Sequence, residues 1–267
     1  MFLKLDDLDF ILNSLLEEQP EYRQLIIPSE MVGKKQLMRS LMNLRPPVPI
    51  SELFLKAQDK ELQKQLHEKG IVRLNQALLS PIDNRLKLWQ GDITRLKADA
   101  IVNAANSQML GCFVPLHSCI DNAIHSAAGI QLRLECNELI KKQDHPEPTG
   151  SAKLTKAYNL PSNFVIHTVG PIIINGRVTQ KEESQLADCY HSCLLLAEKN
   201  NLKSISFCCI STGEYRFPNQ HAAEIAVRTV CEYFGEYKYT GIETVVFNVY
   251  KDIDYSIYSQ ILECGKV

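Results

Sequence analysis

Apolar residues follow two different patterns along the chain, and the pattern changes near residue 80. Before that point leucines recur at helical spacing, which predicts helices over 30–44, over 52–69 and in an opening segment capped at Asp6 or Asp7. The leucines of the opening segment are Leu5, Leu8, Leu12, Leu15 and Leu16. We therefore predict a helical N-terminal extension, residues 1–80, in which no residue suggests chemistry.

After residue 80, short apolar runs alternate with helical stretches. The runs predict strands at 85–90, 100–104, 153–158, 164–169, 204–210 and 244–250. The helical spacing between them predicts helices at 120–128, 131–142, 182–200, 219–234 and 253–262. Such alternation is typical of a three-layer α/β domain around a largely buried sheet, and we place this domain at residues 81–267.

Composition narrows the classes of partner. The 267 residues are 45% hydrophobic and 22% charged, as in an ordinary soluble globular protein. A net charge of −2 argues against nucleic acid as a partner, although backbone N–H groups could still bind a compact diphosphate. No apolar run is long enough for a membrane span, and the first residues lack the pattern of a secretory signal. The nine cysteines are expected to be buried thiols or metal ligands. The predicted location is the cytoplasm, with no membrane partner.

Four segments at predicted strand ends carry polar or metal-binding side chains, and ligands bind at such ends in open α/β sheets. In the first, 91–94, Asp92 can accept a hydrogen bond from an exocyclic amine or simply cap the next turn. In the second, 103–106, small alanines allow a ligand close to the backbone and Asn106 offers an amide to hydroxyl groups. Asparagines at a strand end are also ordinary turn formers, so this signal is weak by itself.

The third segment, 111–119, brings Cys112, His117 and Cys119 within eight residues of one another. Two thiolates and an imidazole suit Zn²⁺, and three protein ligands without an obvious fourth are typical of a catalytic zinc site. The alternative is two loop thiols beside an incidental histidine. The fourth segment, 211–218, is a glycine-containing turn before a helix, which could bind phosphate or merely connect two elements.

Three other groups are predicted to be structural. In 189–193, helical spacing puts the two thiols on one face of a helix and the histidine on another. The adjacent Cys208 and Cys209 must point to opposite faces of a strand. His167 is expected to be hydrogen-bonded within the sheet rather than catalytic.

Taken together, the four segments resemble the macrodomain family, an ADP-ribose-binding α/β/α module with a mixed, mostly parallel sheet. The likeness covers about residues 85–267 and rests on GDITRLKADAIVNAAN (91–106), IDNAIHSAAG (120–129), GSAKLTKAYNLPSNFVIHTVGP (150–171) and STGEYRFP (211–218). GCFVPLHSCIDNAIH resembles the signature of the zinc-dependent microbial branch, where most macrodomains have a run of glycines. The helical extension is also similar to that branch.

The resemblance implies roles for individual residues. Asp92 would contact the adenine amine with help from the Ile93 N–H, and Tyr250 could stack on adenine. Asn106 would hold the distal ribose. Asp121 occupies the position of the family's catalytic or water-orienting acid. The diphosphate would lie in the loop formed by Ser211, Thr212, Gly213, Glu214, Tyr215, Arg216 and Phe217, in which Arg216 replaces the glycine of many relatives.

The implied activity is zinc-dependent hydrolysis that removes mono-ADP-ribose from protein side chains, with a carboxylate linkage expected. Asn106 and Asp121 would be catalytic, and one Zn²⁺ on Cys112, His117 and Cys119 would activate water or only orient the sugar. The family likeness also suggests a sirtuin-like ADP-ribosyltransferase as functional partner and a lipoyl-carrier protein as target. The alternatives are a non-catalytic reader of ADP-ribosylated proteins and an O-acetyl-ADP-ribose deacetylase.

Overall fold

A seven-stranded sheet forms the centre of the molecule, in a computed structural model that describes residues 7–264. Its strand order is β2-β3-β9-β8-β5-β7-β6, and the inner neighbours pair in parallel while the edge strands β2 and β6 run antiparallel. The strands are β2 (Leu78–Leu79), β3 (Leu86–Gln90), β5 (Ala100–Ala105), β6 (Ala152–Lys156), β7 (Phe164–Val169), β8 (Ser204–Phe207) and β9 (Thr244–Val249). The predicted mixed, mostly parallel sheet is thus confirmed.

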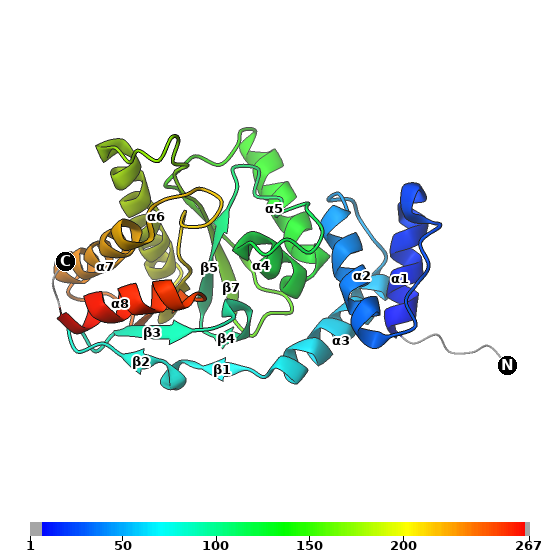
Figure 1. Cartoon of the computed structure of the whole chain (residues 1–267), viewed down its shortest axis with the longest axis horizontal. Coiled ribbons are helices and arrows are strands. Elements are labelled where there is room, and N and C mark those ends of the chain that lie inside the picture. The colour runs from blue at the N-terminus through cyan, green and yellow to red at the C-terminus, as the bar shows by residue number, and fades with distance from the viewer. Residues whose placement is uncertain (1–6, 265–267) are drawn as a thin grey trace.

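Helices cover both faces of this sheet, as predicted for a three-layer domain. Figure 1 shows α4 and α5 on one side of strands β5 and β7, with α6 and α7 on the other side. The helices are α4 (Ile120–Ala128), α5 (Ile130–Gln143), α6 (Gln180–Lys199), α7 (Asn219–Glu236) and α8 (Asp252–Cys264). The central strands are buried almost throughout because both of their faces are covered.

The N-terminal extension packs as three helices with a core of their own. They are α1 (Asp7–Glu18), α2 (Met31–Leu44) and α3 (Glu52–Lys69), with the turn η1 (Pro20–Tyr22) between the first two. The apolar face of α1 buries the predicted Leu8, Leu12, Leu15 and Leu16, whereas Leu5 and Asp6 lie outside the described residues. Ile130, at the start of α5, joins the same cluster and ties the extension to the sheet domain.

Short elements connect the extension to the sheet. β1 (Val72–Arg73) pairs in parallel with β4 (Leu96–Lys97), and β2 is an edge of the main sheet. The turns η2 (Leu74–Gln76) and η3 (Ile93–Arg95) follow β1 and β3. The helical spacing did not predict β1 and β2, because two-residue strands are too short for a periodic pattern. The boundary at residue 80 stays a prediction.

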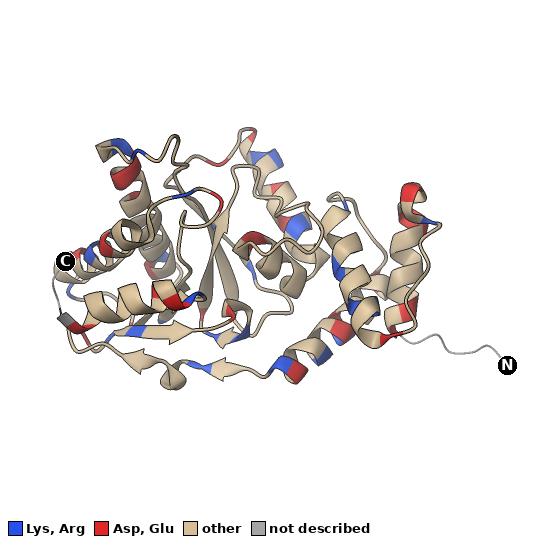
Figure 2. Ribbon diagram, viewed as in Figure 1, with Lys and Arg blue, Asp and Glu red and all other residues tan. Residues whose placement is uncertain are grey.

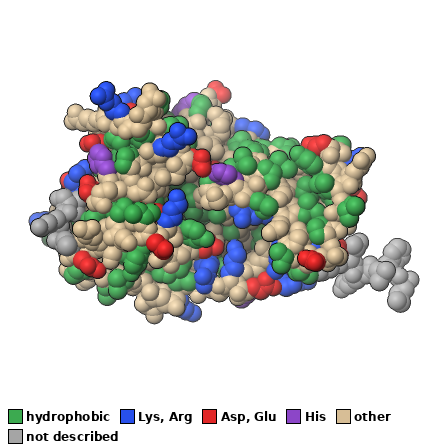
Figure 3. Space-filling view, in the orientation of Figure 1, with side chains coloured by type: hydrophobic (Ala, Val, Ile, Leu, Met, Phe, Trp, Pro, Cys, Tyr) green, Lys and Arg blue, Asp and Glu red, His purple; other side chains and the backbone are tan. Residues whose placement is uncertain are grey.

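Several strands end earlier than the pattern predicted. β8 stops at Phe207, where its pairing with β9 also stops, and the apolar residues 208–210 continue into a loop instead. Charged residues of both signs are interspersed along the helices in Figure 2 and over the face in Figure 3, without an extended patch of one charge. Among the described residues, no helix is long and apolar enough to cross a membrane.

Candidate active site

A cavity of about 920 Å³ opens at the carboxyl ends of the parallel strands. The four predicted segments converge on this cavity, because parallel strands end at the same edge of the sheet. They are 91–94 after β3, 104–106 at the end of β5, 111–121 before and within α4, and 211–215 beyond β8. Tyr250, directly after β9, adds an exposed ring at the rim. The opposite wall comes from α2 and α3 through Lys35, Met38, Arg39, Met42, Leu62, Gln65, Leu66 and Lys69.

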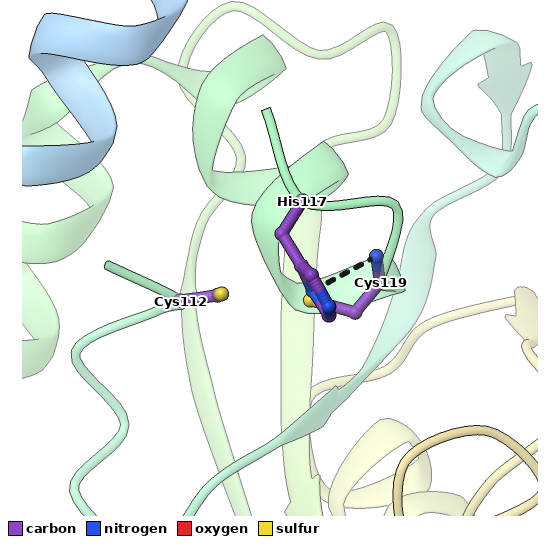
Figure 4. Close-up of side chains that lie close together, drawn as sticks. All are labelled: Cys112, His117 and Cys119. Carbon is purple, nitrogen blue, oxygen red and sulfur yellow. Dashed lines mark hydrogen bonds between the residues drawn. The ribbon is translucent and has the colours of Figure 1, made fainter. Parts of the chain in front are cut away.

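Cys112, His117 and Cys119 form a compact group of metal-ligand atoms at this cavity (Figure 4). The Sγ and imidazole nitrogen atoms lie within 4.8 Å of one another. The loop curls through left-handed backbone conformations at Gly111 (φ 79°) and Leu116 (φ 56°), which brings its two ends together. The structure therefore gathers the three predicted metal ligands.

The environment of Cys119 suits a thiolate that is bound to a cation. Cys119 is the N-cap residue of α4, and its Sγ accepts a hydrogen bond from the Asn122 N–H at 3.4 Å. Burial raises the pKa of the Cys119 thiol to about 12, and the nearby Cys112 and Asp121 also raise it. A divalent cation between the two sulfurs would reverse this balance, because a coordinated thiol deprotonates. The two sulfurs and one imidazole are the donors that Zn²⁺ accepts in catalytic sites, so the residues fit this ion.

His117 offers one nitrogen to such an ion. The Cys119 N–H donates to His117 Nδ1 at 3.4 Å, which leaves Nε2 for another partner. Glu214 Oε1, from the loop beyond β8, lies 3.6 Å from that Nε2. Two of the four segments therefore meet at His117.

Asn106 and Asp121 lie next to each other beside the metal-ligand group. Asp121 is buried in the first turn of α4, where its Oδ2 accepts from Asn106 Nδ2 at 3.3 Å and its Oδ1 from Asn103 Nδ2 at 2.8 Å. Burial raises the pKa of Asp121 to about 6, although the Asn103 hydrogen bond and the charge of Arg133 oppose the rise. A carboxylate with this pKa is ionised at neutral pH and can accept a proton.

A second group, His125, Cys136 and His167, is close enough to hold a metal, but His167 already takes part in a buried hydrogen-bond network. Asn103 Nδ2 donates to Asp121 and also to His167 Nδ1 at 3.1 Å, so Nδ1 is an acceptor. His167 Nε2 then carries the proton and donates to the Thr155 hydroxyl at 2.9 Å, which leaves no lone pair for an ion. Burial also lowers the pKa of His167 to about 3, which keeps it neutral. His167 is hydrogen-bonded within the sheet, as predicted.

Asp92 fulfils the capping role and leaves one oxygen for a ligand. Its Oδ1 accepts from the Thr94 N–H at 3.0 Å and from the Thr94 hydroxyl at 2.6 Å. Its Oδ2 lies 3.7 Å from Lys69 Nζ at the cavity wall. Asn248 Nδ2 donates to the Gly91 carbonyl at 3.0 Å and so fixes the strand end that carries Asp92. The two interpretations of Asp92 are thus compatible.

The 211–217 loop forms a tight backbone turn at the cavity. The Phe217 N–H donates to the Ser211 carbonyl at 2.9 Å, and the Arg216 N–H donates to the Gly213 carbonyl at 3.0 Å. Ser211 through Tyr215 line the cavity, whereas Arg216 is exposed outside the lining and Phe217 is buried in the core. Arg216 has a φ of 60°, the left-handed conformation that glycine adopts with least strain.

The sequence analysis did not predict that α2 and α3 form a wall of the cavity. Arg39 lies 78 positions before His117 in the chain, and its Nη2 nevertheless donates to the His117 carbonyl at 3.1 Å. Lys69 similarly reaches Asp92 from the last turn of α3. No local signal marks such residues, since helical spacing says which face of a helix is apolar but not what that face covers.

Cys189 and Cys193 are buried on one face of α6, as predicted. Cys208 and Cys209 stand beyond the end of β8, where both line the cavity. The expectation that they would alternate across a strand is therefore wrong, because the β8 ladder ends one residue earlier.

Comparisons with known proteins place these features in a family. The family profile described as "Macro domain" matches residues 102–226. A protein of Treponema medium named "Protein-ADP-ribose hydrolase" is 49% identical over 95% of this chain and 97% of its own length. A protein of the same name from Staphylococcus aureus (strain Mu50) is 45% identical over 96% of this chain and 94% of its own.

A solved structure shows that the similarity extends to the three-dimensional fold. The Trypanosoma brucei macrodomain in complex with ADP-ribose superposes with a TM-score of 0.64 at 31% sequence identity. The match covers 84% of this chain and 94% of that one, so it extends beyond the sheet domain. With near-full-length relatives at 45–49% identity and a shared fold, the chain belongs to the macrodomain family.

Proposed function

We propose that the protein hydrolyses the bond between ADP-ribose and a modified protein side chain, with a zinc ion held by Cys112, His117 and Cys119. The observation that carries this proposal is the position of the Asn106–Asp121 pair beside the three metal-ligand side chains in one cavity. The names of the relatives from Treponema medium and Staphylococcus aureus support the reaction. The bound ADP-ribose in the Trypanosoma brucei structure supports the ligand.

The nucleotide would lie across the ends of the strands, with its parts held by different segments. Asp92 Oδ2 can accept from the adenine amine beside its contact with Lys69, the Ile93 N–H can donate to the base, and Tyr250 can cover its face. The backbone N–H groups from Ser211 to Tyr215 would bind the diphosphate. This arrangement directs the distal ribose towards Asn106 and the metal-ligand loop.

Hydrolysis adds water across the bond between ribose C1″ and the acceptor oxygen. A bond forms from the water oxygen to C1″, the bond from C1″ to the acceptor breaks, and the water's proton ends on the departing carboxylate. Asp121 would accept that proton first and return it to the leaving group, while two asparagine amides hold its carboxylate in place. A zinc ion would supply Lewis acidity that orients the sugar or lowers the pKa of water. Asn106 would fix the sugar.

The test is release of ADP-ribose from a modified protein, measured together with the zinc content of each preparation. We expect Cys119→Ala and Asn106→Ala to lose most turnover, and Cys119→Ala also to lose zinc. Cys231→Ala is the matched control, because Cys231 lies on α7 away from the cavity and should keep both properties. Full turnover by metal-free Cys119→Ala would remove zinc from the mechanism. ADP-ribose binding without any turnover by the wild type would make the protein a reader.

The finer biological assignments rest on sequence reasoning alone: the linkage, the target and the partner enzyme on the family resemblance, and the location on the composition of the chain. A carboxylate linkage, a lipoyl-carrier target, a sirtuin-like partner enzyme and a cytoplasmic location all stay predictions. Comparing release of ADP-ribose from aspartate-, glutamate- and arginine-linked substrates would test the linkage, with cleavage of the arginine-linked form contradicting it.

A further inference from the structure

One arginine of the N-terminal extension contacts the loop that carries the three metal-ligand side chains. Arg39, on α2, donates from Nη2 to the His117 carbonyl at 3.1 Å. The same guanidinium donates to Asn122 Oδ1, at 2.7 Å from Nη2 and 3.2 Å from Nε. Arg39 therefore spans from the loop to the first turn of α4.

Asn122 links Arg39 to the other two ligand residues, Cys112 and Cys119. Its side chain is fully buried, and its Nδ2 donates to the Val114 carbonyl at 2.9 Å and to the Cys112 carbonyl at 3.5 Å. Its backbone N–H donates to Cys119 Sγ. The Arg39–Asn122 pair thus touches Cys112, His117 and Cys119, each through a different hydrogen bond.

Asn43, one turn further along α2, adds a second contact of the same kind. Its Oδ1 accepts from the Leu116 N–H at 3.1 Å, and its Nδ2 donates to the Ser126 hydroxyl at 2.9 Å. Leu116 is the residue in the left-handed conformation, so this contact supports the backbone where the loop turns. Two neighbouring side chains of α2 therefore hold the loop at separate points.

We infer that α2 of the N-terminal extension positions the metal-ligand loop, and that Arg39 is the positioning residue that sets its affinity for zinc. The loop itself is exposed at residues 113–116 and contains no secondary structure, so its ligand geometry depends on these outside contacts. Partners that orient ligands without touching the metal commonly change metal affinity 10- to 100-fold. The inference rests on the proposed zinc site.

The test measures zinc affinity by competition with a chromophoric chelator in full-length protein. We expect Arg39→Ala to weaken zinc binding roughly 10- to 100-fold and to regain turnover when zinc is added in excess. Arg39→Lys keeps the charge, but one ammonium cannot span both acceptors, so it should weaken binding as well. Lys34→Ala is the matched control: it removes a cation from the same helix, and Lys34 pairs with Asp9 on α1, away from the loop.

A second measurement separates positioning from folding. Hydrogen exchange at the Leu116 amide of the metal-free protein should be faster in Arg39→Lys than in wild type, while exchange in the α1 helix stays unchanged. If Arg39→Ala does not fold, zinc affinity and Leu116 exchange in Arg39→Lys test the inference. Wild-type zinc affinity and wild-type Leu116 exchange in the folded Arg39 variants would overturn the inference. Absence of zinc binding by the wild type would instead overturn the proposed function, and the exchange experiment would still judge the loop contacts.

Discussion

The two oxygens of Asp92 have different partners, which allows the base-reading role to be tested apart from the capping role. Oδ1 accepts two hydrogen bonds from Thr94, whereas Oδ2 lies 3.7 Å from Lys69 Nζ, and both residues line the cavity. In Asp92→Asn the amide oxygen must take the Oδ1 position, because an NH₂ group there would meet two donors. The new NH₂ would then point into the cavity, where the adenine amine also donates.

The expected loss follows from these hydrogen bonds. A hydrogen bond from adenine to a charged acceptor contributes about 2 kcal/mol, so Asp92→Asn should weaken ADP-ribose binding roughly thirtyfold. The cap remains, and the Lys69 contact at 3.7 Å lies between half-exposed groups, so stability should hardly change. Asp92→Ala should lose the same affinity and, in addition, about 1 kcal/mol of stability from the cap.

Calorimetry with two ligands gives the decisive comparison. A hypoxanthine analogue of ADP-ribose replaces the amine by a carbonyl oxygen, which accepts rather than donates. Wild type should prefer the adenine form, and Asp92→Asn should prefer the hypoxanthine form, because its NH₂ can donate to that oxygen. Equal affinity of wild type and Asp92→Asn for ADP-ribose, with the preference for adenine unchanged, would refute the assignment of Oδ2 to the base.

Two further predictions concern the extension and the loop. Arg45→Ala should lower the free energy of unfolding by about 3 kcal/mol in urea titrations, because the buried guanidinium forms two hydrogen bonds with Glu18 and bonds to backbone carbonyls; an unchanged midpoint would contradict this. Gly111→Ala should reduce bound zinc measured by metal analysis, since a Cβ there would stand 2.8 Å from the His125 ring at a φ of 79°. Full zinc occupancy in that variant would show that the loop tolerates the shift.

Local patterns were sufficient for the longer helices and strands and for the general position of the site, but not for the two-residue strands β1, β2 and β4. The apolar runs predicted β5, β7 and β9 because buried parallel strands are rich in apolar residues, and β3 was predicted from its alternating Leu86 and Leu88 and the adjacent Trp89. Segments at strand ends then had to converge, since parallel strands share one carboxyl edge. The same reasoning cannot assign every residue of a loop. The role of Phe217 in ligand binding stays a prediction that its side chain does not support, because the turn closed by its own N–H places the ring in the core.

The extension shows why the remaining part of the site was not predictable. Helical spacing identified the apolar faces of α1, α2 and α3. An apolar face must be buried against another element, but the spacing does not say which element that is. The three helices cover one another, and Ile130 at the α4–α5 junction joins their core. In this packing α2 also lies against the metal-ligand loop. Arg39 and Asn122 are 83 positions apart, and neither would stand out in its own helix. Their pairing is a consequence of docking, so the part of the site that the extension supplies exists only once both halves of the chain have folded together.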